Sequence, residues 1–204
     1  MARPAAEPLR RAEIVRATIQ EIGQTGTLEV TVAQIARRAG VSSALAHHYF
    51  GSKEAIFLAA MRHILGIYGA EVRGALATVE GPRDRIEAIV RVSFSQMNFR
   101  REVIAAWMNF YVLAQTMDGA HRLLEIYRRR LRSNLVVNLR PLVGAEAGRI
   151  ADSLGALIDG VYLRAALGRS VPDRAAAAAL VMGHLETELA RGAAAASQQA
   201  RKGQ

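Results

Sequence analysis

The sequence predicts an all-α protein in which an N-terminal three-helix head, built around a helix-turn-helix, is joined to a larger C-terminal helical bundle. Apolar residues recur at helical spacing in successive segments, and no segment shows the sustained alternation of a half-buried strand. Residues 31–50 hold two short helical patterns joined by a glycine turn. The length of 204 residues suits one large or two small domains.

The segment 31–50 carries the strongest local signal. Its first helix presents one apolar face at positions i, i+3, i+4 and i+7, made of Val32, Ile35, Ala36 and Ala39. Gly40 can end that helix in the left-handed conformation that glycine tolerates. Ser42 can cap a second helix over about 43–50. Two helices with a small residue at their crossing and a sharp glycine turn between them are what a DNA-reading helix-turn-helix requires.

We therefore expect DNA contacts from this unit. Phosphate anchors are expected at Thr31, Tyr49 and Lys53, and Lys53 opens a helix whose N-terminal amides already favour an anion. Base edges are expected to meet Ser42, Ser43, Ala44 and His47. The neighbouring His48 is assigned to phosphates or base edges, because adjacent histidines on a helix point in different directions and chelate a metal poorly.

The other helices are expected from apolar periodicity and from the glycines and prolines that interrupt it. The first runs over about 9–22 with Gly23 as its end, and one from about Ser52 past Tyr68 has two apolar faces and is expected to link the head to the body. Further helices are expected over about 82–99 and 102–116, from after a turn at Asp118 and Gly119 to about Leu139, over about 145–167, and from about 172 onwards.

Composition excludes several classes of protein. The net charge of +9 suits a polyanionic partner, although the 25 arginines and 2 lysines are spread along the chain. The absence of cysteine excludes disulfides and thiol catalysis. The five histidines lack zinc spacing, and there is no phosphate-binding glycine loop or nucleophile elbow, so we expect no enzyme activity, no metal and no cofactor. With no apolar run near 18 residues and no signal peptide, a soluble cytoplasmic protein is expected.

A group of aromatic residues in the second half has two interpretations. Trp107, Phe110 and Tyr111 share one helical face, Tyr127 follows in the next helix, and Asp159 and Tyr162 lie three residues apart in the one after. An aromatic stripe at helical spacing is usually core. Aromatic faces with one carboxylate can alternatively enclose a quaternary ammonium ion, which offers no hydrogen-bond donor.

The first sixty residues resemble the tetracycline-repressor (TetR) family of transcription regulators. The resemblance rests on RRAEIVRATIQEIGQTG, TVAQIARRAGVS and HYFGSKEAIFLAAM. The chain departs from that family at Ala44, where glycine is usual, and at His47, where tyrosine is usual. The resemblance implies a repressor that binds a palindromic operator as a homodimer, with its last two helices pairing in a four-helix bundle.

The body of the chain is similar to the choline-responsive repressors of glycine betaine synthesis, through IAAWMNFYVLA, YRRRLRSNLVVNLRPL and ALIDGVYLRAAL. This implies repression of choline-to-betaine genes, released by choline, with Trp107, Phe110, Tyr111, Asp159 and Tyr162 in the effector pocket. The expected division is an arm over 1–8, a DNA-binding domain over 9–52, a ligand-binding and dimerisation domain over 53–191 and a flexible tail over 192–204. A TetR-family repressor with a different effector, a ligand-independent DNA-binding protein and a small helical enzyme are the alternatives.

Overall fold

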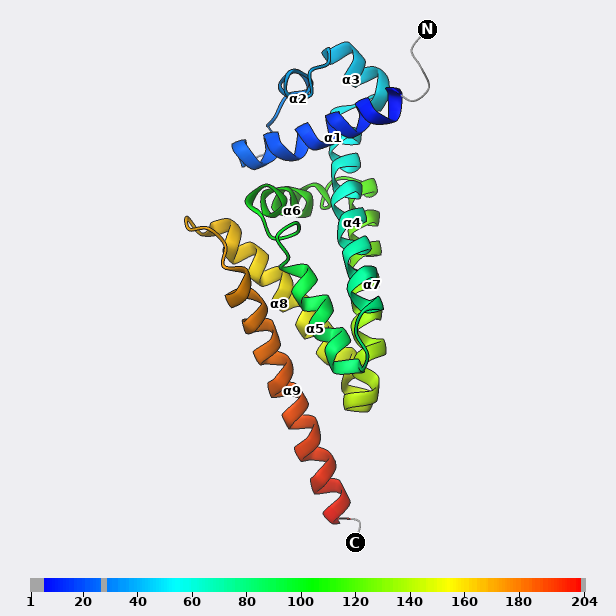
Figure 1. Ribbon diagram of the computed structural model, residues 1–204, viewed down its shortest axis with the longest axis vertical. Coiled ribbons are helices and arrows are strands. Elements are labelled where there is room, and N and C mark those ends of the chain that lie inside the picture. The colour runs from blue at the N-terminus through cyan, green and yellow to red at the C-terminus, as the bar shows by residue number, and fades with distance from the viewer. Residues whose placement is uncertain (1–5, 27–28, 203–204) are drawn as a thin grey trace. The chain divides into compact units, whose positions relative to one another are not determined.

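The computed structural model describes residues 6–26 and 29–202, and in that part of the chain it contains helices and no strands (Figure 1). The all-α prediction is confirmed. The helices are α1 (Ala6–Thr25), α2 (Val32–Arg38), α3 (Ser43–Phe50), α4 (Lys53–Ala77), α5 (Pro82–Ser93), α6 (Arg101–Leu113), α7 (Asp118–Val143), the short 3-10 helix η1 (Gly144–Glu146), α8 (Ala147–Leu167) and α9 (Arg174–Lys202).

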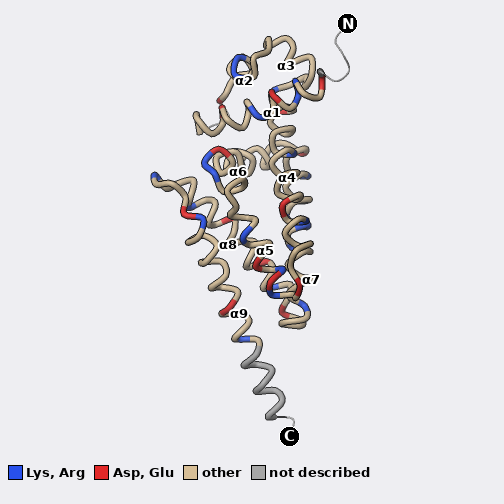
Figure 2. The backbone as a smooth tube through the Cα atoms, viewed as in Figure 1, with Lys and Arg blue, Asp and Glu red and all other residues tan. Residues whose placement is uncertain are grey.

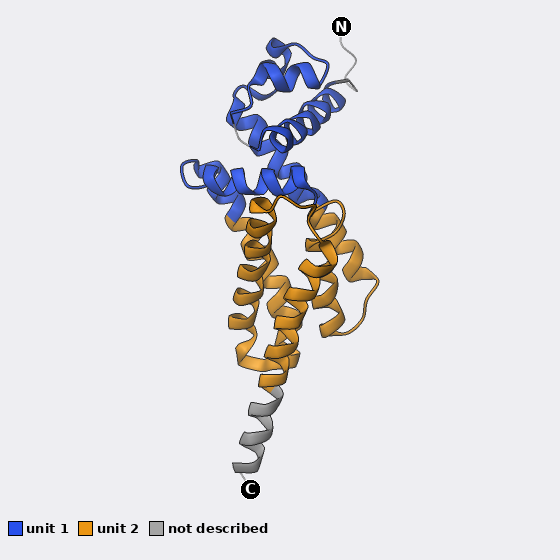
Figure 3. Cartoon of the chain, turned by 90° about the vertical axis from the view of Figure 1, so that its left-hand side faces the viewer, with its two compact units in different colours: residues 1–67, 100–124 blue, residues 68–99, 125–204 orange. Residues whose placement is uncertain are grey.

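The chain divides into two compact units (Figure 3). Unit 1 comprises residues 1–67 and 100–124, and unit 2 comprises residues 68–99 and 125–204. The helices α4 and α7 each contribute residues to both units. These units group residues by packing and do not coincide with the expected functional division at residue 52, which stays a prediction.

Unit 1 is built around α1, which packs against α2 and α6. The apolar face expected for this helix is confirmed, because Val15, Thr18, Ile19 and Ile22 are all buried. The hydroxyl of Thr18 donates to the carbonyl of Ile14 at 2.8 Å, which satisfies it inside the core.

Gly23 does not end α1 as expected. The helix continues to Thr25, and the left-handed backbone falls at Gly26, with φ of 72°. Gly23 instead lies where α1 meets α6: an added Cβ would stand 2.6 Å from Cβ of Glu102 and 2.7 Å from its backbone Cα. The missing side chain therefore serves a close helix–helix approach and not a turn.

Several further boundaries differ from the expected ones, and α7 begins at Asp118, where a turn formed by Asp118 and Gly119 is expected. The helix expected over 82–99 ends at Ser93, and residues 94–100 form turns in which the Asn98 amide donates to the carbonyl of Val92 at 3.0 Å. Pro141 lies inside α7 instead of ending it. At the two ends of the chain, residues 6–8 belong to α1 and residues 192–202 to α9, where an arm and a flexible tail are predicted; residues 1–5 and 203–204 lie outside the described part.

The helix α4 is long and apolar enough to cross a membrane by length and composition, against the expectation that no segment would be. Several of its apolar residues are nevertheless core residues of the protein, since Ile56, Phe57, Met61 and Ile64 are all buried. This packing explains the hydropathy of α4 without a membrane.

Candidate functional site

The helix α2 begins at a complete capping box. Gln34 donates its backbone N–H to the hydroxyl oxygen of Thr31 at 3.2 Å, and the backbone N–H of Thr31 donates to the Gln34 side chain at 2.7 Å. Two backbone donors at the start of a seven-residue helix are thereby satisfied. Thr31 is exposed, so its hydroxyl lies at the surface while it caps α2.

The turn between α2 and α3 forms as the sequence predicts. Gly40 has φ of 67°, a conformation that favours glycine, and the N–H of Val41 donates to the carbonyl of Ala36 at 3.0 Å. The helices meet at two small residues, since Ala36 and Ala46 are fully buried. Ala36 was expected at this crossing and Ala46 was not, because short alanine-rich helices give little sign of which alanine faces inwards.

The helix α3 exposes the residues expected to read DNA. Its cap is Ser42, whose hydroxyl oxygen accepts from the N–H of Leu45 at 3.1 Å. Ser42, Ser43, Ala44, His47 and His48 are all exposed. An exposed helix carrying small and hydrogen-bonding side chains has the dimensions and chemistry that a major groove accepts.

The end of α3 is fixed from α1. Arg11 donates to the backbone carbonyl of Tyr49 at 2.5 Å, and its guanidinium lies 4.5 Å from the centre of the Phe50 ring. Tyr49 is half-buried against His48, with 5.6 Å between ring centres. Arg11 was missed from the sequence, because nothing in its spacing links it to a helix 38 residues further on.

Lys53 is the first residue of α4. The hydroxyl of Ser52 caps this helix by accepting from the N–H of Ala55 at 3.2 Å. The ammonium of Lys53 lies 5.4 Å from the ring centre of Phe57, so the side chain is held along the first turn of the helix. An anion at this position would meet both the lysine and the helix N-terminus.

Basic residues occur in α1 and α2 and also along α7 (Figure 2). Residues 1–63 carry eight Lys and Arg and five Asp and Glu, so 8 − 5 leaves only +3 of the net +9. The net charge therefore suits a polyanionic partner but does not indicate where on the chain that partner binds. The exposed side chains of α3 are the better indication of a DNA-binding surface.

The six aromatic and acidic residues expected around the effector fall into two groups. In unit 1, the ring of Trp107 lies 5.9 Å from that of Phe110 and 5.6 Å from that of Tyr111, so the shared face is confirmed. Trp107 is only 5% exposed, which makes it part of the core of this unit. Tyr127, Asp159 and Tyr162 belong to unit 2.

In unit 2, Tyr162 is held by backbone groups that the sequence does not reveal. Its hydroxyl donates to the carbonyls of Ser93 (2.7 Å) and Asn98 (3.0 Å), and its ring packs 5.0 Å from that of Phe99. Burial raises the pKa of Tyr162, and the nearby Tyr68, Asp159 and Glu71 raise it further. The phenol therefore stays protonated and acts as a donor.

Tyr127 and Asp159 line one cavity of about 420 Å³ between α7 and α8. The ring of Tyr127 lies 5.8 Å from that of Tyr68, whose pKa burial raises to about 12. Three arginines line this cavity, and two of them are engaged by neighbouring carboxylates: Arg132 bonds Asp152 at 2.6 Å, and Arg128 pairs with Glu125 at 3.7 Å. The cavity therefore joins an aromatic ring to a carboxylate.

Two protein families match this chain, one at each end. The family described as "Bacterial regulatory proteins, tetR family" matches residues 14–60, and the family described as "BetI-type transcriptional repressor, C-terminal" matches residues 82–190. The chain belongs to the TetR family, among its BetI-type transcriptional repressors. The expected class of protein, a DNA-binding repressor of the choline–betaine pathway and not an enzyme, is confirmed.

The chain is 53% identical to the HTH-type transcriptional regulator BetI of Brucella anthropi over 184 residues, which cover 90% of this chain and 95% of that protein. It is 50% identical to BetI of Rhizobium meliloti over 167 residues, covering 81% and 82%. A regulator from Saccharomonospora viridis, solved in complex with choline, shares the fold with a TM-score of 0.76 at 21% identity, covering 86% of this chain and 95% of that one.

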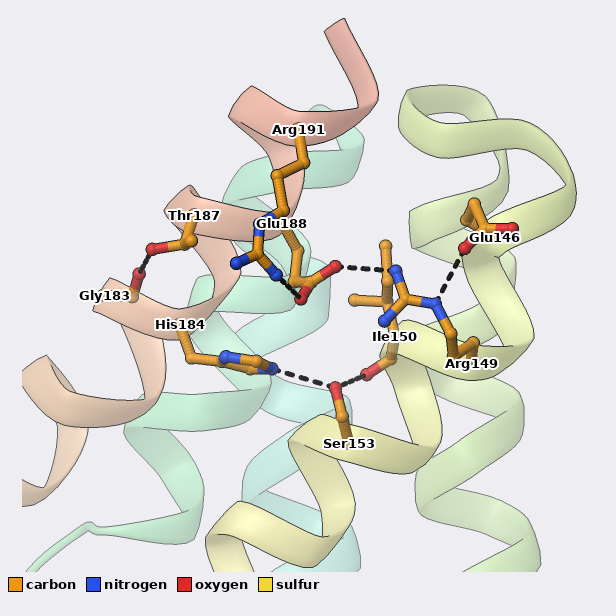
Figure 4. Close-up of polar contacts among 9 residues, drawn as sticks. All are labelled: Glu146, Arg149, Ile150, Ser153, Gly183, His184, Thr187, Glu188 and Arg191. Carbon is orange, nitrogen blue, oxygen red and sulfur yellow. Dashed lines mark hydrogen bonds and ion pairs between the residues drawn. The ribbon is translucent and has the colours of Figure 1, made fainter. Parts of the chain in front are cut away.

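In this BetI-type repressor, α8 and α9 are joined by a polar network (Figure 4). Arg149 donates to the carboxylate of Glu188 at 2.7 Å, and the hydroxyl of Ser153 lies 2.9 Å from Nε2 of His184. The hydrogen bond from Arg149 holds the pKa of Glu188 below its usual range. Glu188 is 3% exposed, so its charge is neutralised by arginines rather than by water.

The same two helices leave an apolar surface uncovered in the single chain. Leu163 and Leu167 on α8, Val171 after it and Leu180 on α9 are exposed, Leu167 by 77%. Leu163, Val171 and Leu180 line one pocket of about 650 Å³ in unit 2. Leu167 does not line it, but the next residue, Gly168, does. Large apolar side chains grouped in this way indicate a surface that contacts another protein.

Proposed function

We propose that the chain is a homodimeric repressor that binds a palindromic operator and leaves it when choline, or a related quaternary ammonium ion, occupies the helical body. The match of residues 82–190 to the BetI-type C-terminal domain is the observation that supports this most, because that is the part of the chain where an effector would bind. As a cytoplasmic protein, the repressor would meet both DNA and effector directly.

In this proposal residues 9–52 form the functional head, and α3 enters the major groove. Ser42, Ser43, Ala44 and His47 meet base edges, while Thr31, His48, Tyr49 and Lys53 lie towards the backbone. Two heads related by a two-fold axis would read half-sites about one helical turn, ~34–36 Å, apart. The exposed residues of α3 and the caps at Thr31 and Ser42 support this role.

The second chain of the dimer is assigned to the apolar surface of α8 and α9. Burying exposed leucines against their symmetry mates removes apolar surface from water, at about 25 cal/mol per Å². The network of Arg149 and Glu188 supports the assignment, since it holds the two helices together as one face.

Choline is assigned to the body between residues 53 and 191. The residues proposed for its recognition form two candidate groups: Trp107, Phe110 and Tyr111 in unit 1, and Tyr127 and Tyr162 in unit 2, with Asp159 of unit 2 as a counter-charge. The choline bound to the Saccharomonospora viridis regulator of the same fold supports this choice of effector. A ligand shifts the repressor off DNA only by binding the DNA-free state more tightly.

Choline is expected to release the labelled operator, whereas its neutral analogue, with a tert-butyl carbon in place of the ammonium, is expected to require at least roughly tenfold more ligand. The analogue keeps the shape and loses the charge, and a desolvated cation over an aromatic ring is worth about 2 kcal/mol. Fluorescence anisotropy of the operator complex measures both. Equal potency of the two compounds, or no release by millimolar choline, would contradict choline as the effector.

Two substitutions in the head are expected to have different effects on DNA binding. Lys53→Ala removes a phosphate contact, so it should weaken operator and random DNA about equally and lower the salt slope by about one. His47→Ala removes a base contact and should change which operator variants are preferred. Anisotropy against a panel of single-base variants distinguishes the two. If Lys53→Ala leaves affinity and salt slope unchanged, Lys53 is not a phosphate anchor.

A further inference from the structure

Glu71 on α4 has an environment that differs from that of other carboxylates in unit 2. It is half-buried, and its oxygen Oε2 accepts from the Ser95 hydroxyl at 2.8 Å and from the Asn98 amide at 2.6 Å. Both partners are neutral. They orient the carboxylate and bring no positive charge to it.

Three other half-buried or buried carboxylates of unit 2 pair with arginine. Glu87 bonds Arg91 at 2.6 Å, Glu125 lies 3.7 Å from Arg128, and Glu188 bonds Arg149 at 2.7 Å. Among the residues that the structure describes, no arginine or lysine forms an ion pair with Glu71. Its negative charge therefore remains to attract a cation from outside the chain.

Two tyrosines are connected to this carboxylate indirectly, through a chain of hydrogen bonds that passes through Ser93 and Asn98. Tyr68 lies one helical turn before Glu71, and its hydroxyl is 3.4 Å from that of Ser93. Asn98 bonds Glu71 through its amide and accepts the Tyr162 hydroxyl at its backbone carbonyl. Glu71 thus belongs to the same cluster as Tyr68 and Tyr162, and the Tyr68 ring extends the cluster to Tyr127 at the cavity beside Asp159.

Electrostatics support this grouping. Asp159 and Glu71 both contribute to raising the pKa of Tyr162, after burial and Tyr68. The Tyr162 hydroxyl therefore lies in the negative field of two carboxylates. Such a field favours a positive ligand and disfavours one that carries its own carboxylate.

We propose that Glu71 is a counter-charge for the quaternary ammonium ligand, in a site within unit 2 to which Tyr68, Tyr127 and Tyr162 contribute aromatic faces. The ligand class rests on the proposed function; the assignment of Glu71 and Tyr68 does not follow from it. A carboxylate held by two neutral donors among aromatic rings provides what such a cation requires: opposite charge and π-faces, with no need for a hydrogen bond from the ligand.

The test is isothermal titration of the full-length protein and its Glu71→Gln variant with choline and with the neutral tert-butyl analogue. The substituted glutamine keeps the size and an acceptor oxygen and removes the charge. We expect choline to bind at least roughly tenfold more weakly to Glu71→Gln, and the neutral analogue to bind both proteins alike. Operator affinity without ligand should not change.

Glu80→Gln is the matched control, because Glu80 is a carboxylate of the same unit that lies outside the cluster, and its loss removes the same net charge. It should bind choline as the unchanged protein does. Glu71→Asp, which keeps the charge, should retain part of the affinity. Glycine betaine, which carries a carboxylate, should bind weakly to the unchanged protein and lose less affinity than choline in Glu71→Gln.

The outcomes separate the two proposals. If the unchanged protein and Glu71→Gln bind choline equally, the assignment of Glu71 is wrong and the choline-released repressor stands. If choline fails but tetramethylammonium or betaine aldehyde binds in a Glu71-dependent way, the site stands and the effector changes. If no quaternary ammonium compound binds the unchanged protein, both proposals are wrong.

Discussion

Operator affinity is expected to fall roughly a thousandfold or more when salt rises from about 50 to about 200 mM. Each phosphate that a lysine or arginine neutralises releases condensed counterions, so the logarithm of the affinity falls linearly with the logarithm of the salt concentration. In the proposed complex Lys53, at the start of α4, supplies one such contact, and the expected fall applies if several phosphates are contacted in all. Anisotropy titrations at four or five salt concentrations give the slope.

A random duplex of the same length is the control for this measurement. Its affinity should show a similar slope at a much weaker absolute level, because phosphate contacts are shared and base contacts are not. A shallow slope on the operator would show that few phosphates are contacted. Equal affinity for operator and random DNA at physiological salt would contradict a sequence-specific repressor.

Gly23→Ala is expected to destabilise the protein by about 1–3 kcal/mol, the usual cost of forcing extra atoms into a packed interface. Two effects oppose each other at this position. Alanine favours a helix over glycine by about 1 kcal/mol. The new methyl group, however, would stand 2.7 Å from the backbone Cα of Glu102, so a whole helix has to move and not only a flexible side chain. Urea unfolding measures the difference.

Gly66→Ala is the matched control, because Gly66 lies in α4 of the same unit and an added Cβ there meets nothing within 4 Å. The same change of residue should be neutral or stabilise the fold by up to about 1 kcal/mol. If Gly23→Ala is as stable as Gly66→Ala, then α1 and α6 do not pack as closely as the structure shows.

The sequence predicts features that depend on neighbours in the chain. The cap at Ser42 and the turn at Gly40 each need residues within a few positions, and both are confirmed. Gly23 was interpreted wrongly because a glycine required by a distant helix looks the same in a sequence as one that ends its own helix.

The proposed effector site of Glu71, Tyr68, Tyr127 and Tyr162 depends on contacts between residues far apart in the chain. The carbonyls of Ser93 and Asn98 are 69 and 64 residues from the tyrosine whose hydroxyl they accept. Because every residue has a backbone carbonyl, a sequence pattern also cannot show which carbonyl accepts a hydrogen bond. The aromatic stripe at Trp107 was visible from spacing, whereas Glu71 could be found only once its neutral partners were known.

The burial of Glu188 affects how the protein should respond to a rise in salt concentration inside a dehydrated cell. Salt weakens interactions between exposed charges beyond about 10 Å at 0.1 M and affects buried pairs much less. The ion pair of Arg149 and Glu188, which joins α8 to α9, is partly buried: Glu188 is 3% exposed and the Arg149 side chain 57% exposed. The side of α3 that is proposed to meet DNA is open to solvent. When a cell loses water and its cytoplasmic ions become concentrated, the hold on DNA should loosen while the helical body stays folded. Dehydration alone would then begin to relieve repression before any effector accumulates.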